Sequence, residues 1–287
     1  MAELLAHKDP GNFKTLPLYV EGTADGLSYS GLGSPLNFSQ MLELRRPVQA
    51  ANAWHFALEL ANLGVSVRLT LAWQDRDHWL LVRQQRRDRN DTVLKLISGY
   101  VPAHEVSLPL LTALNEVAEE CLIENGNTWL SGRYADTWLP TPYPLNYCRD
   151  AHFSLTPLSG AALPVQCGDL PLLERPRAYV HLPTASLQLV YDMRLELPQS
   201  CHRPSLFHVD EHLEHGQLLV RLERSRPDIY LLPLHNDYPT GELLTLRQGK
   251  LHPASTSDIW MSEGFARQDG WLVRDERIRW QDWLNSL

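Results

Sequence analysis

Alternation of apolar and polar residues predicts a β-hairpin in the first third of the chain. The run Val65–Trp73 alternates and is rich in residues that favour strands. The polar link Gln74–Asp77 separates it from a second strand-like run, His78–Arg83, so the two runs are expected to pair. A third run, Val93–Val101, carries Gly99. The pattern therefore predicts a hairpin followed by a strand that contains a glycine.

Helical periodicity marks two other segments. From Pro47 to Leu63 apolar residues recur at near-helical spacing, with a proline near the start and Gly64 after the end, which predicts a helix. From Leu108 to Ile123 the apolar residues again follow a helical period, and Asn125-Gly126 would end that helix. Further on, Leu187–Leu197 predicts a strand.

Turn-forming residues divide the chain into three parts. Residues 1–46 hold several turn formers without a sustained period, and we interpret them as an N-terminal arm. Residues 47–200 contain the predicted strands and helices, with a proline-rich insertion at about 139–176 that we interpret as an ordered excursion or a lid. Residues 201–287 would form a C-terminal extension that completes or packs on the core.

Composition and charge narrow the range of partners. The chain has 287 residues, of which 44% are hydrophobic, and this is enough for a substantial core. A formal net charge of -8 argues against long-range attraction to nucleic acid or to an anionic membrane. No run approaches the ~18 apolar residues of a membrane span, and the first residues lack the features of a secretory signal. We expect a cytoplasmic protein, and homo-oligomer formation is left open.

Three carboxylates in the second predicted helix form the most informative cluster. Glu116, Glu119 and Glu120 are spaced i, i+3 and i+4, so a helix makes them neighbours on one face. Carboxylates this crowded repel one another unless positive charge lies between them. Mg²⁺ prefers oxygen ligands and would supply that charge. The alternative is an ordinary solvated acidic face.

The segment from residue 99 to residue 123 resembles the Nudix hydrolases. Their signature is Gly-x5-Glu-x7-Arg-Glu-apolar-x-Glu-Glu-x-Gly-apolar, on a loop, a helix and a loop. The matching residues are Gly99, Glu105, Glu116, Glu119 and Glu120. The chain departs from the signature in three ways: nine residues separate Glu105 from Asn115, Asn115 replaces the arginine, and Leu122 replaces the glycine.

The resemblance implies a fold and an activity. The fold would be α+β, with a Nudix-like mixed β-sheet sandwiched by helices. The activity would be that of a pyrophosphohydrolase that cleaves a nucleoside diphosphate linked to another moiety, with Mg²⁺ or Mn²⁺. The metal ligands would be Glu116, Glu119 and Glu120, with Glu105 and the carbonyl of Gly99 as further candidates. Either Glu119 or Glu120 could act as the catalytic base.

Other residues are candidates for substrate binding. Arg83 and Arg86, together with Arg87 and Arg89, could contact phosphates, and Tyr100 could stack on a base, although a solvated turn and core packing are the alternatives.

A second candidate metal site lies in the C-terminal third. His208, His212 and His215 would share one face of a helix, where they could bind zinc, but the segment fits a strand almost as well.

Two further interpretations compete with metal-dependent hydrolysis. The first is a catalytically inactive Nudix-like module that binds a nucleotide or a protein. The second is an unrelated α+β interaction protein.

Overall fold

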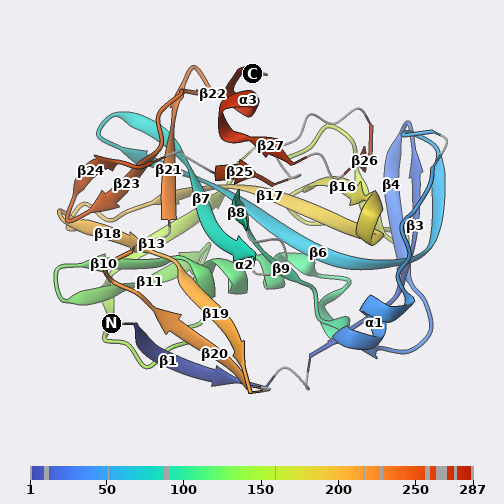
Figure 1. The fold of residues 1–287 in the computed structure, drawn as a ribbon, viewed down its shortest axis with the longest axis horizontal. Coiled ribbons are helices and arrows are strands. Elements are labelled where there is room, and N and C mark those ends of the chain that lie inside the picture. The colour runs from blue at the N-terminus through green and yellow to red at the C-terminus, as the bar shows by residue number, and fades with distance from the viewer. Residues whose placement is uncertain are drawn as a thin grey trace.

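The computed structural model describes residues 2–9, 13–50, 52–86, 91–158, 160–215, 217–226, 229–255, 259–262, 270–274 and 277–285. Most of these residues lie in strands (Figure 1). The helices are α1 (Phe38–Leu44), α2 (Pro109–Glu120) and α3 (Trp280–Asn285), and the 3₁₀ turns are η2 (Ala103–Glu105) and η3 (Leu182–Thr184).

The strands of the first half are β1 (Glu3–Lys8), β2 (Lys14–Thr15), β3 (Leu18–Thr23), β4 (Gly26–Gly31), β5 (Leu36–Asn37), β6 (Phe56–Trp73), β7 (Arg76–Arg86), β8 (Asp91–Lys95), β9 (Ile97–Tyr100), β10 (Leu122–Asn125), β11 (Thr128–Tyr134) and β12 (Thr137–Trp138). Those of the second half are β13 (Tyr147–Pro157), β14 (Val165–Cys167), β15 (Leu170–Pro171), β16 (Arg177–His181), β17 (Ser186–Glu196), β18 (Pro204–Phe207), β19 (Val209–Glu214), β20 (Gln217–Leu222), β21 (Ile229–His235), β22 (Tyr238–Pro239), β23 (Leu244–Arg247), β24 (Lys250–Pro253), β25 (Ile259–Met261), β26 (Leu272–Val273) and β27 (Ile278–Arg279).

The long strand β6 organises the main sheet. On one edge it pairs in parallel with β17, from Asn62 opposite Ser186 to Leu71 opposite Leu195. On the other edge it pairs antiparallel with β9 and then with β7, and its first residues, 56–61, pair antiparallel with β3. Parallel and antiparallel ladders therefore meet in one mixed sheet, as expected. The predicted hairpin is the β6–β7 pair, in which Thr70 lies opposite Trp79.

The predicted helix over residues 47–63 is wrong. The second half of that segment is the start of β6, and Leu58, Ala61 and Leu63 are buried there. The strand wins because hydrogen bonds to β3 and to β17 are available along this stretch, and pairing of that kind overrides a weak helical period. The described helices are few and short, so the expected cover of helices on both faces of the sheet is not confirmed.

Helix α2 lies between two layers of strands. Its apolar side packs on β6 and β9 of the main sheet, and its far side contacts β19. Strands β1, β20 and β19 form a separate three-stranded antiparallel sheet on that far side (Figure 1). This small sheet has its own core, in which Leu5, Val220 and Phe207 are buried with Trp129 and Tyr143.

The segments predicted as an arm and as an insertion also contribute strands. Strand β1 belongs to the small sheet, and β3 pairs with β6. Strand β13 lies inside the proline-rich stretch and pairs with β11 and β17. The division of the chain at residues 46 and 200 stays a prediction. None of the helices in the described part of the chain is long and apolar enough to cross a membrane.

Candidate functional site

Helix α2 packs an apolar side on the main sheet and carries its glutamates next to that side and beyond it. Leu110, Ala113, Leu114 and Val117 recur at helical spacing and are buried against the sheet. The proline at the first position, Pro109, suits a helix start because its missing N–H would have no partner there. Winding then places Glu116 and Glu120 at the border of the buried side, near β9 and β8, and turns Glu119 toward the small sheet.

Strand β9 brings Gly99 directly against Glu116. A Cβ built on Gly99 would lie only 1.9 Å from Glu116 Oε1 and 2.1 Å from its Cδ. No other residue could stand at position 99 while the carboxyl group keeps its position. The structure thus places together Gly99 and Glu116, which are 17 positions apart by their numbers in the sequence.

Protein cations lie against the other two glutamates. Lys8, at the end of β1, donates to Glu119 and, at 2.8 Å, to Glu211 Oε1 of β19. Lys95 Nζ, at the end of β8, lies 3.9 Å from Glu120 Oε1. His208 Nε2 lies 3.6 Å from Glu120 Oε2. The positive charge required between crowded carboxylates therefore comes from the chain itself.

These contacts shift the pKa values in different directions. Burial, with the negative charges of Glu120 and Glu119, raises the pKa of Glu116 to about 8, so this side chain is mostly a neutral acid at pH 7. Burial would also raise the pKa of Glu120, but the charge of Lys95 and the contact with His208 outweigh it and lower that pKa. Burial opposes the charged form of Lys8, yet its bonds to Glu119 and Glu211 raise the pKa of Lys8.

Glu105 does not join this cluster through any described contact. Its Oε2 accepts a 2.6 Å hydrogen bond from Thr112 Oγ1 in the first turns of α2, and its Oε1 lies 3.6 Å from His104 Nε2. Glu105 therefore links η2 to α2 through a side-chain hydrogen bond.

The residues present do not fit a divalent cation. A metal ion on the acidic face would meet the ammonium group of Lys8 at Glu119 and that of Lys95 near Glu120. Across the described ranges, no group of three His, Cys, Asp or Glu side chains is arranged to hold a metal ion. The expectation that Glu116, Glu119 and Glu120 hold Mg²⁺ or Mn²⁺ is therefore not supported.

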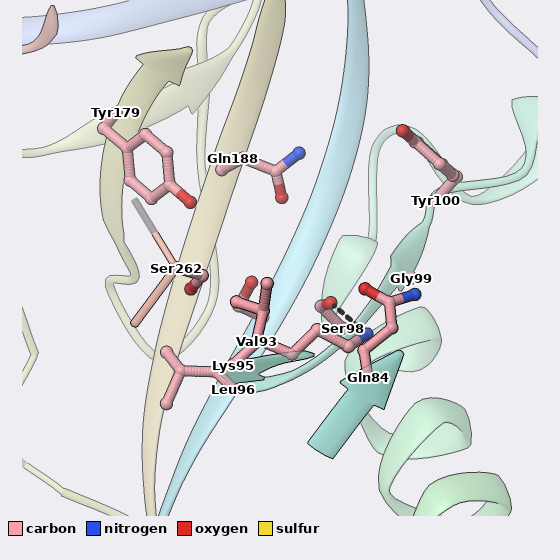
Figure 2. Close-up of a pocket in the computed structure, with 11 residues that line it drawn as sticks. Gln84, Val93, Lys95, Leu96, Ser98, Gly99, Tyr100, Tyr179, Gln188 and Ser262 are labelled. Atoms are coloured by element: carbon pink, nitrogen blue, oxygen red, sulfur yellow. Dashed lines mark hydrogen bonds between the residues drawn. The ribbon is translucent and has the colours of Figure 1, made fainter. Parts of the chain in front are cut away.

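A polar cavity opens on the main sheet beside Gly99. Its volume is about 290 Å³, and it lies where β6, β7, β8, β9 and β17 converge. Its polar lining includes the hydroxyl groups of Ser66, Ser98 and Ser262, the carboxamides of Gln84 and Gln188, and the ammonium group of Lys95. Lys95 Nζ donates a 3.0 Å hydrogen bond to Ser98 Oγ (Figure 2). Lys95 thus connects the cavity with the acidic face of α2.

The predicted substrate-binding residues have different positions. Tyr100 lines the cavity and is 36% exposed, at the opposite end from Tyr179 (Figure 2). Arg83 does not line it, because successive side chains of a strand alternate and the neighbouring Gln84 faces the cavity. Arg83 Nη2 instead lies 3.4 Å from Thr92 Oγ1.

The remaining arginines of this group lie outside the described residues. This holds for the side chain of Arg86 and for all of Arg87 and Arg89. Their proposed contacts with phosphates stay predictions.

The helical arrangement of the histidines is wrong, because residues 209–214 form β19. His208 precedes that strand and contacts Glu120, and His215 follows it with a left-handed φ of 50°. The side chain of His212 lies outside the described residues. A strand does not bring residues at i, i+4 and i+7 to one face, so the basis for a zinc site is lost.

Sequence reasoning missed Lys8, Lys95 and Glu211. Lys8 and Glu119 are 111 positions apart, and Lys8 and Glu211 are 203 positions apart. No local spacing connects such residues. The pairing of β1 with β20 and of β20 with β19 brings Lys8 and Glu211 to α2, whereas Lys95 comes from the end of β8, four positions before Gly99.

Comparisons with known proteins do not assign the chain to a family. No protein-family model matches the chain, and no curated protein matches it. Among solved structures, the chain is similar to a MutT/nudix family protein from Enterococcus faecalis, at 15% sequence identity and a TM-score of 0.23. The match covers 67% of this chain and 58% of that chain. A TM-score of this size does not establish a common fold.

Proposed function

We propose that the chain is a catalytically inactive Nudix-like module that binds a small polar ligand in the cavity beside Gly99. The cavity is the observation that carries this proposal. Its lining combines hydroxyl groups, carboxamides and one ammonium group, and none of its described lining residues is Asp or Glu. A few convergent polar groups in a concave site are typical of ligand recognition.

The size of the cavity limits the ligand. A volume of about 290 Å³ is at the lower end of the range of roughly 300–1,000 Å³ for small-molecule sites. One moiety of a nucleotide derivative fits such a space, whereas two linked nucleosides would extend into solvent. Because the segment around Gly99 resembles the Nudix signature, nucleotide-derived diphosphates are the first class to test.

The state of the acidic helix supports binding without hydrolysis. Metal-assisted attack on phosphorus needs carboxylates that are free to hold the metal ion. Glu119 is paired with Lys8, Glu120 lies near Lys95, and the surroundings of Glu116 favour its neutral form. The cations of the chain would thus compete with a metal ion for Glu119 and Glu120.

Isothermal titration of the full-length chain with a panel of nucleotide-derived diphosphates tests the proposal. We expect saturable binding of at least one compound, weakened in Lys95→Met and in the milder variant Gln84→Ala. Lys250→Met is the matched control, because Lys250 is exposed and is not among the residues that line the cavity. Equal affinity in the parent and both cavity variants would contradict the assignment of the site.

A parallel assay of product release addresses hydrolysis. With Mg²⁺ or Mn²⁺ present, we expect no turnover of any compound that binds. Metal-dependent turnover that is lost in Glu120→Gln but retained in Glu242→Gln would establish a hydrolase instead. Glu242 is exposed, so that substitution controls for loss of charge alone.

A further inference from the structure

We propose that Lys8 is a built-in counter-cation, which takes the place on the acidic face of α2 that a divalent metal ion would otherwise need to fill. This inference goes beyond the proposed function, because it concerns the face of α2 covered by the small sheet. It holds whether or not the cavity binds a ligand.

Lys8 contacts two carboxylates at once, as a metal ion held between them would. Its ammonium group bridges two carboxylates from different elements, Glu119 of α2 and, at 2.8 Å, Glu211 of β19. An ordinary surface ion pair joins two flexible side chains and contributes little. Here the side chains of Lys8 and Glu119 are 34% and 31% exposed, and that of Glu211 is 43% exposed, so the bridge lies at the border between the small sheet and solvent.

The small sheet determines where Lys8 lies. Along β1, Lys8 pairs with Leu218 of β20, and β20 pairs in turn with β19, which carries Glu211. Leu5 is 6% exposed and anchors β1 in the core of this sheet. The end of the helix is also held, since Tyr143 donates a 3.0 Å hydrogen bond to the backbone carbonyl of Glu119. Lys8 is therefore positioned by backbone pairing and packing.

The charges near the acidic face leave no need for a metal ion. Glu119, Glu120 and Glu211 supply three negative charges when ionised, and Lys8 and Lys95 supply two positive ones. The imidazole of His208 lies beside Glu120 as a further group that can carry positive charge. The net charge of these five groups is therefore one negative unit. A bound divalent ion would change it to one positive unit. Without Lys8, the same face would have two uncompensated negative charges.

Binding of Mn²⁺ to the full-length chain tests this inference, with electron paramagnetic resonance to count bound ions and thermal unfolding as a second readout. We expect no saturable Mn²⁺ binding by the parent, by Lys8→Arg, which keeps the charge, or by the exposed-site control Lys250→Met. Lys8→Met should bind Mn²⁺ at least about tenfold more tightly than the parent, because one like charge is removed next to the ion. Mn²⁺ should also raise the unfolding temperature of Lys8→Met alone.

The double variant Lys8→Met/Glu119→Gln identifies the ligand. It should lose the Mn²⁺ binding gained in Lys8→Met, because one carboxylate of the face is removed. Lys8→Gln provides a polar second replacement should the methionine variant fail to fold.

Three results would overturn the inference. The first is Mn²⁺ binding by the parent that is as tight as in Lys8→Met and Lys8→Gln. The second is Mn²⁺ binding that is undetectable in both neutral replacements of Lys8. The third is retention of the gained binding in the double variant, which would place the ion away from Glu119.

Discussion

Replacing Glu116 by Gln should make the stability of the protein less dependent on pH. Burial and the charges of Glu120 and Glu119 raise the pKa of Glu116 from 4.5 to about 8. Between these values the unfolded chain has released the proton and the folded chain retains it. The unfolded state therefore binds fewer protons, and the free energy of unfolding falls as pH rises through this window. Gln is neutral at every pH and has nearly the shape of the protonated acid.

The structure sets an upper limit on the effect. The interval from 4.5 to about 8 corresponds to at most about 5 kcal/mol, at about 1.4 kcal/mol for each pH unit. Glu116 is partly exposed, and its titration is linked to that of its neighbours. We therefore expect the parent to lose about 2–3 kcal/mol more than Glu116→Gln between pH 5 and pH 9.

Equilibrium urea unfolding at several pH values between 5 and 9 measures this difference. Glu242→Gln is the control, because it removes the same charge from an exposed position. Its pH profile should parallel that of the parent, whereas the profile of Glu116→Gln should be flatter. Parallel profiles for the parent and Glu116→Gln would refute the argument that folding keeps Glu116 protonated.

Three other predictions concern the remainder of the fold. Leu5→Ala should lower the free energy of unfolding by about 2–3 kcal/mol in urea titrations, because it leaves a cavity in the core of the small sheet. Burial lowers the pKa of His78 below 6.5, so denaturation assays should show stability lost as pH falls below about 6.5, and less so in His78→Phe. Burial raises the pKa of the Cys121 thiol to about 12, so mass spectrometry should find alkylation at pH 8 faster at Cys148 than at Cys121.

Local patterns predict the parts of the fold that depend on local pairing. The β6–β7 hairpin follows from alternation on both sides of a polar link, and its turn residues Gln74 and Asp75 take the left-handed backbone conformation at φ 51° and 61°. Helix α2 follows from its apolar stripe, but it ends at Glu120, and the predicted last residues Leu122 and Ile123 belong to β10. The first half of β6 was mispredicted because its apolar spacing also suits a helix. Its actual partners, β3 and β17, are remote in sequence, which no local pattern reveals.

In the candidate site, too, local patterns predict some residues, whereas contacts between remote segments are missed. The resemblance to the signature predicts that Gly99 and Glu116 belong to one site, and the structure brings these two residues into contact. The signature does not predict the cations beside this helix: Lys8 is part of a segment interpreted as an arm, and Lys95 lies in the predicted strand without any pattern that marks it. A sequence shows that crowded carboxylates need positive charge, but it does not show which cation supplies it.

The acidic face of α2 explains why a signature can predict geometry without predicting chemistry. Helical winding alone places Glu116, Glu119 and Glu120 together, so their spacing is the same whatever neutralises them. The neutralising groups depend on the elements packed beside the helix, which here are β1 with Lys8 and β8 with Lys95. Strand β1 is far from the signature in sequence and can change without altering it. A metal-dependent protein and a metal-independent one can thus share the same acidic helix, and the strands that cover it distinguish them.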